Sequence, residues 1–121
     1  MNHERRKELL AQYKEIKIYM GVVKITNIQS GKIYIHAYPN LKNKWLTIKY
    51  QLEMGQFFNV GLQKDYNEIG PDFFTFEILE EKPIDDVTDM KWELSQMEKP
   101  WLLKLQPFDE AGYNRRPLNY D

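Results

Sequence analysis

The sequence predicts an α/β (α+β) sandwich, in which helices pack on a small three-stranded sheet of mixed or antiparallel strands. Three short segments are rich in β-branched and aromatic residues, which is typical of strands. Segments with apolar residues at helical spacing lie before, between and after them. The 121 residues are 42% hydrophobic and 14% aromatic, which is enough for one core but too little for two independent ones.

The N-terminal part of the chain predicts a helix followed by a hairpin. Apolar residues at helical spacing between about 2 and 17 indicate an amphipathic helix. Residues 20–27 and 32–38 have the composition of strands, and Ser30 with Gly31 supplies a turn between them. We therefore expect these two strands to pair as an antiparallel hairpin.

Two helices are expected in the middle of the chain. Asn40 is a good N-cap residue, and the apolar stripe that follows it predicts a helix that stops at Gly55. A second helix is predicted from about 59 to 69, because apolar residues recur at helical spacing there and Gly70 is followed by a proline.

The last part of the chain predicts a strand, a long helix and a tail. Residues 73–79 are aromatic and β-branched, and we expect them to form a central strand of the sheet. A helix follows from about 90 to 105, and Pro100 inside it predicts a kink or a restart near Glu98. Residues 106–121 have the composition of a loop.

The charges are distributed unevenly. The net charge is −1, so the protein is not globally basic. Every full charge between residues 16 and 52 is a lysine, whereas aspartate and glutamate dominate residues 68–98. A lysine-only segment suits a polyanionic partner. Solvated lysines on different faces explain the same pattern, and charge alone favours this second interpretation.

Several classes of site are excluded by composition. The chain has no cysteine and only two histidines, which excludes disulfides and argues against an ordinary zinc site. The glycines are scattered, so no phosphate-binding loop is present. No stretch approaches the ~20 apolar residues of a membrane helix, and no signal peptide is evident, so we expect a cytoplasmic protein.

Six segments, taken together, resemble the GIY-YIG nuclease family in order and spacing. They cover nearly the whole chain after the first predicted helix. The segments are 21–27 (GVVKITN), 31–36 (GKIYIH), 40–45 (NLKNKW), 74–80 (FTFEILE), 97–101 (MEKPW) and 112–114 (GYN). The resemblance implies a GIY-YIG endonuclease-like fold in residues 20–121, with residues 1–19 forming an extra N-terminal helix packed on that domain.

Three positions of the family pattern are retained. The tyrosine that opens the second motif matches Tyr34, whose hydroxyl can orient water or phosphate; a sheet aromatic explains it equally simply. The metal-binding glutamate matches Glu98, which implies a single magnesium ion held by one carboxylate. An exposed helix residue next to Lys99 is the alternative for Glu98. The family's asparagine matches Asn114.

Four other positions are replaced. Lys44 stands where the family has a helix arginine and keeps the charge without the bidentate fork. His36 stands where a glycine closes the second motif, and it is either a base or an ordinary polar strand residue. Val23 and Ile48 stand at positions of polar catalytic side chains and have no polar atom. Losing a general base typically costs about 10²–10⁴-fold in rate.

The resemblance therefore implies a nuclease-like protein that acts on or binds DNA, with impaired or lost metal-dependent phosphodiester hydrolysis. Its implied catalytic residues are Tyr34, His36, Lys44 and Glu98. The implied nucleic-acid-binding residues are Lys24, Lys42, Lys44, Lys49, Asn114 and Arg115. The alternative is a non-catalytic protein-interaction module on the same fold, so whether the chain is an enzyme stays open at this point.

Overall fold

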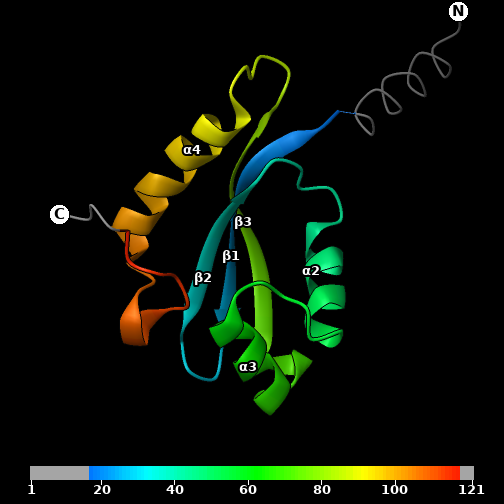
Figure 1. Ribbon diagram of the computed structural model, residues 1–121, viewed down its shortest axis with the longest axis vertical. Helices are drawn as coiled ribbons and strands as arrows, with labels where there is room; N and C mark the ends of the chain where they lie inside the picture. The colour runs from blue at the N-terminus through cyan, green and yellow to red at the C-terminus, as the bar shows by residue number, and fades with distance from the viewer. Residues whose placement is uncertain (1–16, 118–121) are drawn as a thin grey trace, which may run out of the picture.

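The computed structural model describes residues 17–117 and shows helices on both sides of a small sheet (Figure 1). The predicted N-terminal helix and residues 118–121 lie outside the described residues. In chain order the elements are β1 (Tyr19–Asn27), β2 (Ile33–Tyr38), α2 (Lys44–Glu53), α3 (Val60–Ile69), the 3-10 turn η1 (Pro71–Phe73), β3 (Phe74–Pro83), α4 (Met90–Leu105) and the 3-10 turn η2 (Asp109–Ala111).

The sheet is three-stranded and antiparallel, with the order β2-β1-β3. The predicted hairpin of β1 and β2 is confirmed. The prediction that residues 73–79 form a central strand is wrong, because β1 is central and β3 is an edge strand. The burial pattern gives the reason. Most residues of β1 are buried on either face, whereas β3 exposes most of its residues, among them Glu77, Glu80 and Glu81.

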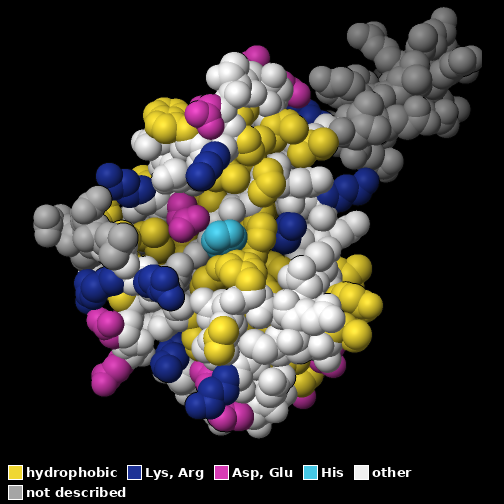
Figure 2. Space-filling model, in the orientation of Figure 1, with side chains coloured by type: hydrophobic (Ala, Val, Ile, Leu, Met, Phe, Trp, Pro, Cys, Tyr) yellow, Lys and Arg dark blue, Asp and Glu magenta, His cyan; other side chains and the backbone are white. Residues whose placement is uncertain are grey.

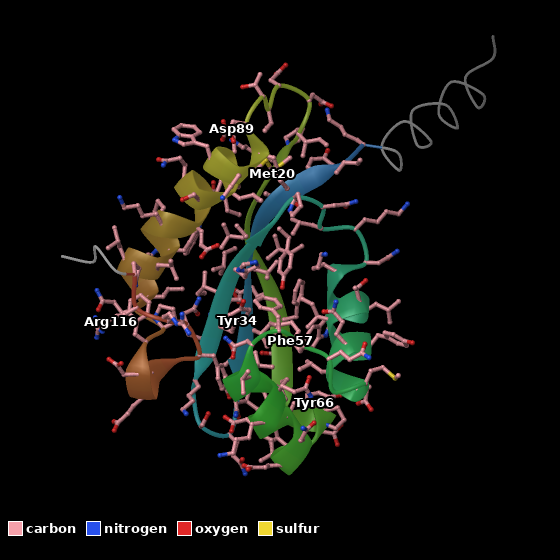
Figure 3. The ribbon with its side chains drawn as sticks, in the orientation of Figure 1. Met20, Tyr34, Phe57, Tyr66, Asp89 and Arg116 are labelled. Atoms are coloured by element: carbon pink, nitrogen blue, oxygen red, sulfur yellow. The ribbon has the colours of Figure 1, made fainter. Side chains whose placement is uncertain are left out.

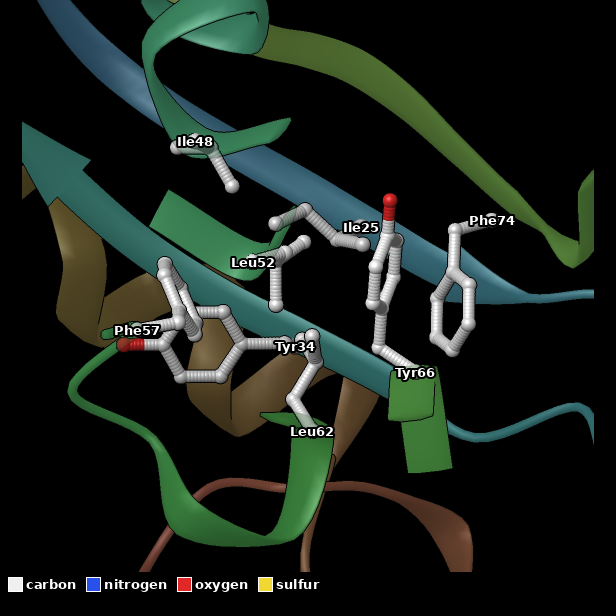
Figure 4. Close-up of a cluster of buried hydrophobic side chains, with 8 residues drawn as sticks. All are labelled: Ile25, Tyr34, Ile48, Leu52, Phe57, Leu62, Tyr66 and Phe74. Carbon is white, nitrogen blue, oxygen red and sulfur yellow. The ribbon is translucent and has the colours of Figure 1, made fainter. Parts of the chain in front are cut away.

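The two faces of the sheet carry two separate apolar clusters. On one face, Ile25 and Tyr34 of the sheet pack with α2 and α3, and Figure 4 shows this cluster closing around Leu52 and Leu62. On the other face, Met20, Val22, Ile35 and Ala37 pack with Met97 of α4. Alternation along the strands separates the two sets, because neighbouring residues point to opposite faces. None of the described helices is long and apolar enough to cross a membrane.

Two helix details differ from the sequence prediction. The helix predicted after Asn40 begins at Lys44, with Asn43 as N-cap in a left-handed conformation (φ 53°). The side chain of Asn40 instead accepts a hydrogen bond from the amide of Lys42 and so stabilises a turn before the helix. Helix α4 runs unbroken through Pro100, so the restart predicted near Glu98 does not occur. Met97, before the proline, packs on the sheet, and Trp101, after it, donates to Glu80 at 2.9 Å; both contacts hold the helix in place.

Close backbone approach requires a glycine at Gly21, opposite Tyr38 in the hairpin. A Cβ atom there would lie 2.1 Å from the carbonyl oxygen of Glu80 and 2.8 Å from Cδ1 of Leu41. The register of β1 against β3 shifts just after it, between Val22 and Val23. The irregularity therefore lies next to Gly21, at the end of the hairpin that carries Tyr38.

Candidate functional site

Three aromatic or imidazole side chains of β2 project from the same face of the sheet. Tyr34, His36 and Tyr38 alternate along the strand, so they point to one side. The rings of Tyr34 and His36 are stacked with centroids 5.9 Å apart, and the ring of Tyr38 meets His36 edge-on at 4.7 Å. The ring of Tyr34 is buried against Phe57, and the two labelled residues lie close together in Figure 3. This row forms the floor of the candidate site.

Glu98 reaches the same strand from α4, on the other side of the sheet. Because β2 is an edge strand, the amide of Ala37 has no strand partner on its outer side, and it donates to Oε2 of Glu98 at 3.1 Å. The same oxygen lies 3.8 Å from Nδ1 of His36. The carboxylate therefore crosses the sheet edge and lies beside the imidazole.

Lys44 supplies a cation to this surface from the first residue of α2. Its Nζ lies 4.5 Å from the centre of the Tyr38 ring, and its charge acts on His36. Tyr34, His36, Lys44 and Glu98, the four residues predicted as catalytic, thus come together from β2, α2 and α4. Figure 2 shows the histidine in the middle of one face of the molecule, between acidic, basic and hydrophobic side chains.

Burial shifts the ionisation of four side chains towards their neutral forms, namely His36, Glu98, Tyr34 and Tyr38. Burial lowers the pKa of His36, and the nearby charge of Lys44 lowers it further. Burial raises the pKa of Glu98, and the hydrogen bond from Ala37 opposes that rise. The pKa of Tyr34 and that of Tyr38 are raised well above the ordinary value, first by burial and then, in part, by the charge of Glu98. Both tyrosines therefore keep their protons at neutral pH, and His36 is neutral there.

Two residues of this surface were missed by sequence reasoning. The hydroxyl of Tyr38 is buried and has no hydrogen-bond partner among the described residues. Phe58 is 59% exposed, although its ring lies 5.3 Å from that of His36. Because side chains alternate along β2, Tyr38 lies on the same face of the sheet as Tyr34. The strand pattern in the sequence could therefore have identified Tyr38. Nothing in the sequence places Phe58, because it lies between two helices and reaches the site only through tertiary packing.

The predicted nucleic-acid-binding lysines are not gathered at this surface. Lys24 projects from the opposite face of β1 and lies 3.9 Å from Glu77 of β3. Lys49 lies over the ring of Trp45, which stacks on β3 and not on β2. Lys42 is exposed in the turn before α2. Of the predicted lysines, only Lys44 belongs to the site.

Asn114 has a structural position at the free edge of β2. Its Oδ1 accepts from the amide of Ile35 at 2.9 Å and its Nδ2 donates to the carbonyl of Ile35 at 2.8 Å. The adjacent Tyr113 amide donates to the carbonyl of Ile33. Because both ends of its amide are used, Asn114 stabilises the edge strand instead of presenting polar groups to a ligand. Arg115 follows directly and is exposed.

Two solved structures have a similar fold. A mutant of the catalytic domain of the intron endonuclease I-TevI is 24% identical to the chain, with a TM-score of 0.66, and the match covers 86% of this chain and 100% of that one. The catalytic domain of the homing endonuclease I-TevI is 26% identical, with a TM-score of 0.65, and the match covers 81% of this chain and 99% of that one. The chain has the GIY-YIG fold. No family model and no curated protein matches the sequence.

The GIY-YIG fold places the segments that resemble the family's two motifs in β1 and β2, side by side in the sheet. Val23, at the tyrosine position of the first motif, pairs with His36 and is fully buried. Ile48, on α2, belongs to the apolar cluster on the same face of the sheet. Both positions are therefore part of the hydrophobic core, where they contribute packing and no polar atom.

The residues of the site fit a single divalent cation only through Glu98 and His36. No group of three or more metal-ligating side chains occurs within residues 17–117. Oε2 of Glu98 is engaged by Ala37, and no hydrogen bond with a described residue uses Oε1. One carboxylate oxygen with water and phosphate oxygens is a mode that magnesium accepts. Glu98 and His36 therefore suit a weakly held ion, which would take its remaining contacts from water and phosphate oxygens.

Proposed function

We propose that this nuclease-like protein binds the phosphodiester backbone of DNA at the surface formed by Tyr34, His36, Lys44 and Glu98, and that its hydrolytic activity is impaired or lost. The observation that carries the proposal is the convergence of these four side chains, from three elements, at one edge of the GIY-YIG fold. Functional groups brought together from distant parts of a chain are the usual mark of a ligand site.

Lys44, His36 and Tyr38 each offer a chemical group that suits a phosphate. Lys44 provides the positive charge, as a point charge without the fork of an arginine. Neutral His36 can accept a proton from water or donate a hydrogen bond to a phosphate oxygen. The buried hydroxyl of Tyr38 has no partner within residues 17–117, which costs about 1–3 kcal/mol, and a polar ligand or water at this surface would remove that cost.

Magnesium would be held here by Glu98, with His36 beside it, and when bound it would neutralise charge that develops on the phosphate. The chain's own residues then position the phosphate and the water. Efficient hydrolysis also needs polar groups at the positions of Val23 and Ile48, which are buried in the core. Because Val23 and Ile48 have no polar atom, we favour DNA binding with weak or absent cleavage.

A second candidate function is a protein-interaction module. Leu46 and Tyr50 of α2 and its C-cap residue Met54 recur four residues apart and are 67%, 64% and 54% exposed. An exposed apolar stripe of this kind is typical of a surface that another protein covers.

DNA binding and plasmid nicking, measured together, test the proposal. We expect salt-dependent binding to a DNA duplex and weak or no nicking with Mg²⁺ or Mn²⁺. Lys44→Ala should weaken binding and lower the salt slope by about one. Lys49→Ala is the matched control, because it removes a lysine from the same helix away from the site, and it should change binding less.

Each outcome of that experiment separates the alternatives. Nicking that Glu98→Gln abolishes would establish an active nuclease. Absence of DNA binding at low salt would refute the proposal and favour the interaction module.

A further inference from the structure

Phe58 presents an unusual aromatic surface beside the candidate site. It is 59% exposed, whereas the preceding Phe57 is 5% exposed and packs in the core. The amide of Phe57 donates to the buried side chain of Gln63 at 2.9 Å, which fixes the backbone where the two rings diverge. Phe58 is therefore held outward by an ordered segment.

Three neighbouring rings contact Phe58 and still leave most of the residue exposed. Phe57, His36 and Tyr34 meet it at interplanar angles of 41°, 56° and 67°, with centroids 4.8, 5.3 and 5.9 Å away. None of these rings is stacked on Phe58. They hold the ring in place, and 59% of the residue stays exposed to an incoming flat group.

The charge beside the ring indicates what that group is. His36 lies between Phe58 and Tyr38, and the Lys44 ammonium lies over Tyr38. A phosphate held at Lys44 and a base stacked on Phe58 would belong to the same stretch of one DNA strand. A purely apolar peptide would match Phe58 but would leave the cation without a partner.

We propose that Phe58 is a stacking platform for an unpaired nucleobase, so that the preferred ligand is a single-stranded or flipped-out DNA segment. The inference rests on the proposed phosphate contact at Lys44 and adds the class of DNA. A base inside a duplex is stacked on its neighbours and does not present its face. The platform therefore selects unpaired nucleotides, whereas Lys44 attracts any phosphate.

The test measures affinity for two oligonucleotides of equal length, a single strand and its blunt duplex, by fluorescence anisotropy. The variant Phe58→Leu keeps an apolar side chain and removes the aromatic face. We expect it to bind the single strand roughly five- to fiftyfold more weakly and to bind the duplex nearly unchanged. Phe58→Trp should retain or strengthen single-strand binding.

Phe73→Leu is the matched control, because Phe73 is 37% exposed and lies in η1, away from His36 and Lys44. It should leave both affinities unchanged. A 2-aminopurine in the single strand gives a direct readout, since stacking on Phe58 should quench its fluorescence in the wild type and less in Phe58→Leu. Unchanged melting temperatures confirm that each variant is folded.

The outcomes distinguish the two proposals. If the wild type binds no DNA, both fail. If the wild type binds both oligonucleotides and Lys44→Ala weakens both, but Phe58→Leu does not change the preference, the phosphate contact stands and the stacking platform is refuted.

Discussion

Glu98 has two separable roles, and a pair of substitutions distinguishes them. Its carboxylate accepts a hydrogen bond from the buried amide of Ala37, and it is also the proposed metal ligand. Glu98→Ala removes both functions. Glu98→Gln keeps an acceptor for the amide and removes the negative charge.

The expected magnitudes follow from the contacts. Without Glu98 the Ala37 amide, at the edge of the sheet, has no acceptor, and an unsatisfied buried donor costs about 1–3 kcal/mol. For a domain of this size that corresponds to a fall in melting temperature of roughly 3–15 °C. Burial already disfavours the charged form of Glu98, as its raised pKa shows, so the neutral glutamine should be at least as stable as the wild type at pH 7.

Urea denaturation at pH 7, together with Mn²⁺ titration by calorimetry, measures both roles. We expect Glu98→Ala to be destabilised and Glu98→Gln to be stable, with metal binding lost in both variants. If Glu98→Gln is as unstable as Glu98→Ala, the hydrogen-bond argument is wrong. If Glu98→Gln binds Mn²⁺ as the wild type does, Glu98 is not the ligand.

Three further predictions concern stability. Gly21→Ala should destabilise by about 1–3 kcal/mol, because the new methyl group would meet the Glu80 carbonyl, whereas Gly61→Ala in α3 meets nothing closer than 3.4 Å and should be neutral or stabilising; thermal unfolding of both variants checks this. Asn114→Ala should cost about 1–3 kcal/mol in urea denaturation, because two hydrogen bonds to the edge of β2 are lost; an unchanged midpoint would contradict that role. Tyr66 donates to a carboxylate of α2, and burial, followed by that hydrogen bond, raises its pKa to about 12. The stability that this contact contributes should be complete below pH 10 and lost as the pH rises towards 12, so the difference in urea midpoint between wild type and Tyr66→Phe should shrink between pH 9 and pH 12.

The local elements were predictable because their signals are local. Composition and turn residues placed the hairpin, and helical spacing with the stop signal at Gly70 placed α3. The start of α2 was not predicted, and of the kink or restart expected at Pro100 the restart does not occur. A turn stabilised by Asn40 competes with capping, and packing on both sides of Pro100 outweighs its helix-breaking tendency.

The residues of the candidate site were likewise predictable only in part. The motif order in the sequence identified Tyr34, His36, Lys44 and Glu98, and the structure brings them together. Motif order did not reveal that Lys24 faces the opposite side of the sheet from Tyr34, because this depends on the register in which β1 pairs with β2.

By itself the sequence determined the class of fold, the approximate limits of most elements and the four polar residues of the site. Only the tertiary structure decided that β1 is the central strand, that Asn114 and Glu98 complete the free edge of β2, and that Phe58 stands beside His36. The physical reason is that propensity and periodicity act between residues close in the chain. Edge positions, buried hydrogen bonds and exposed rings are set by contacts between residues far apart in it.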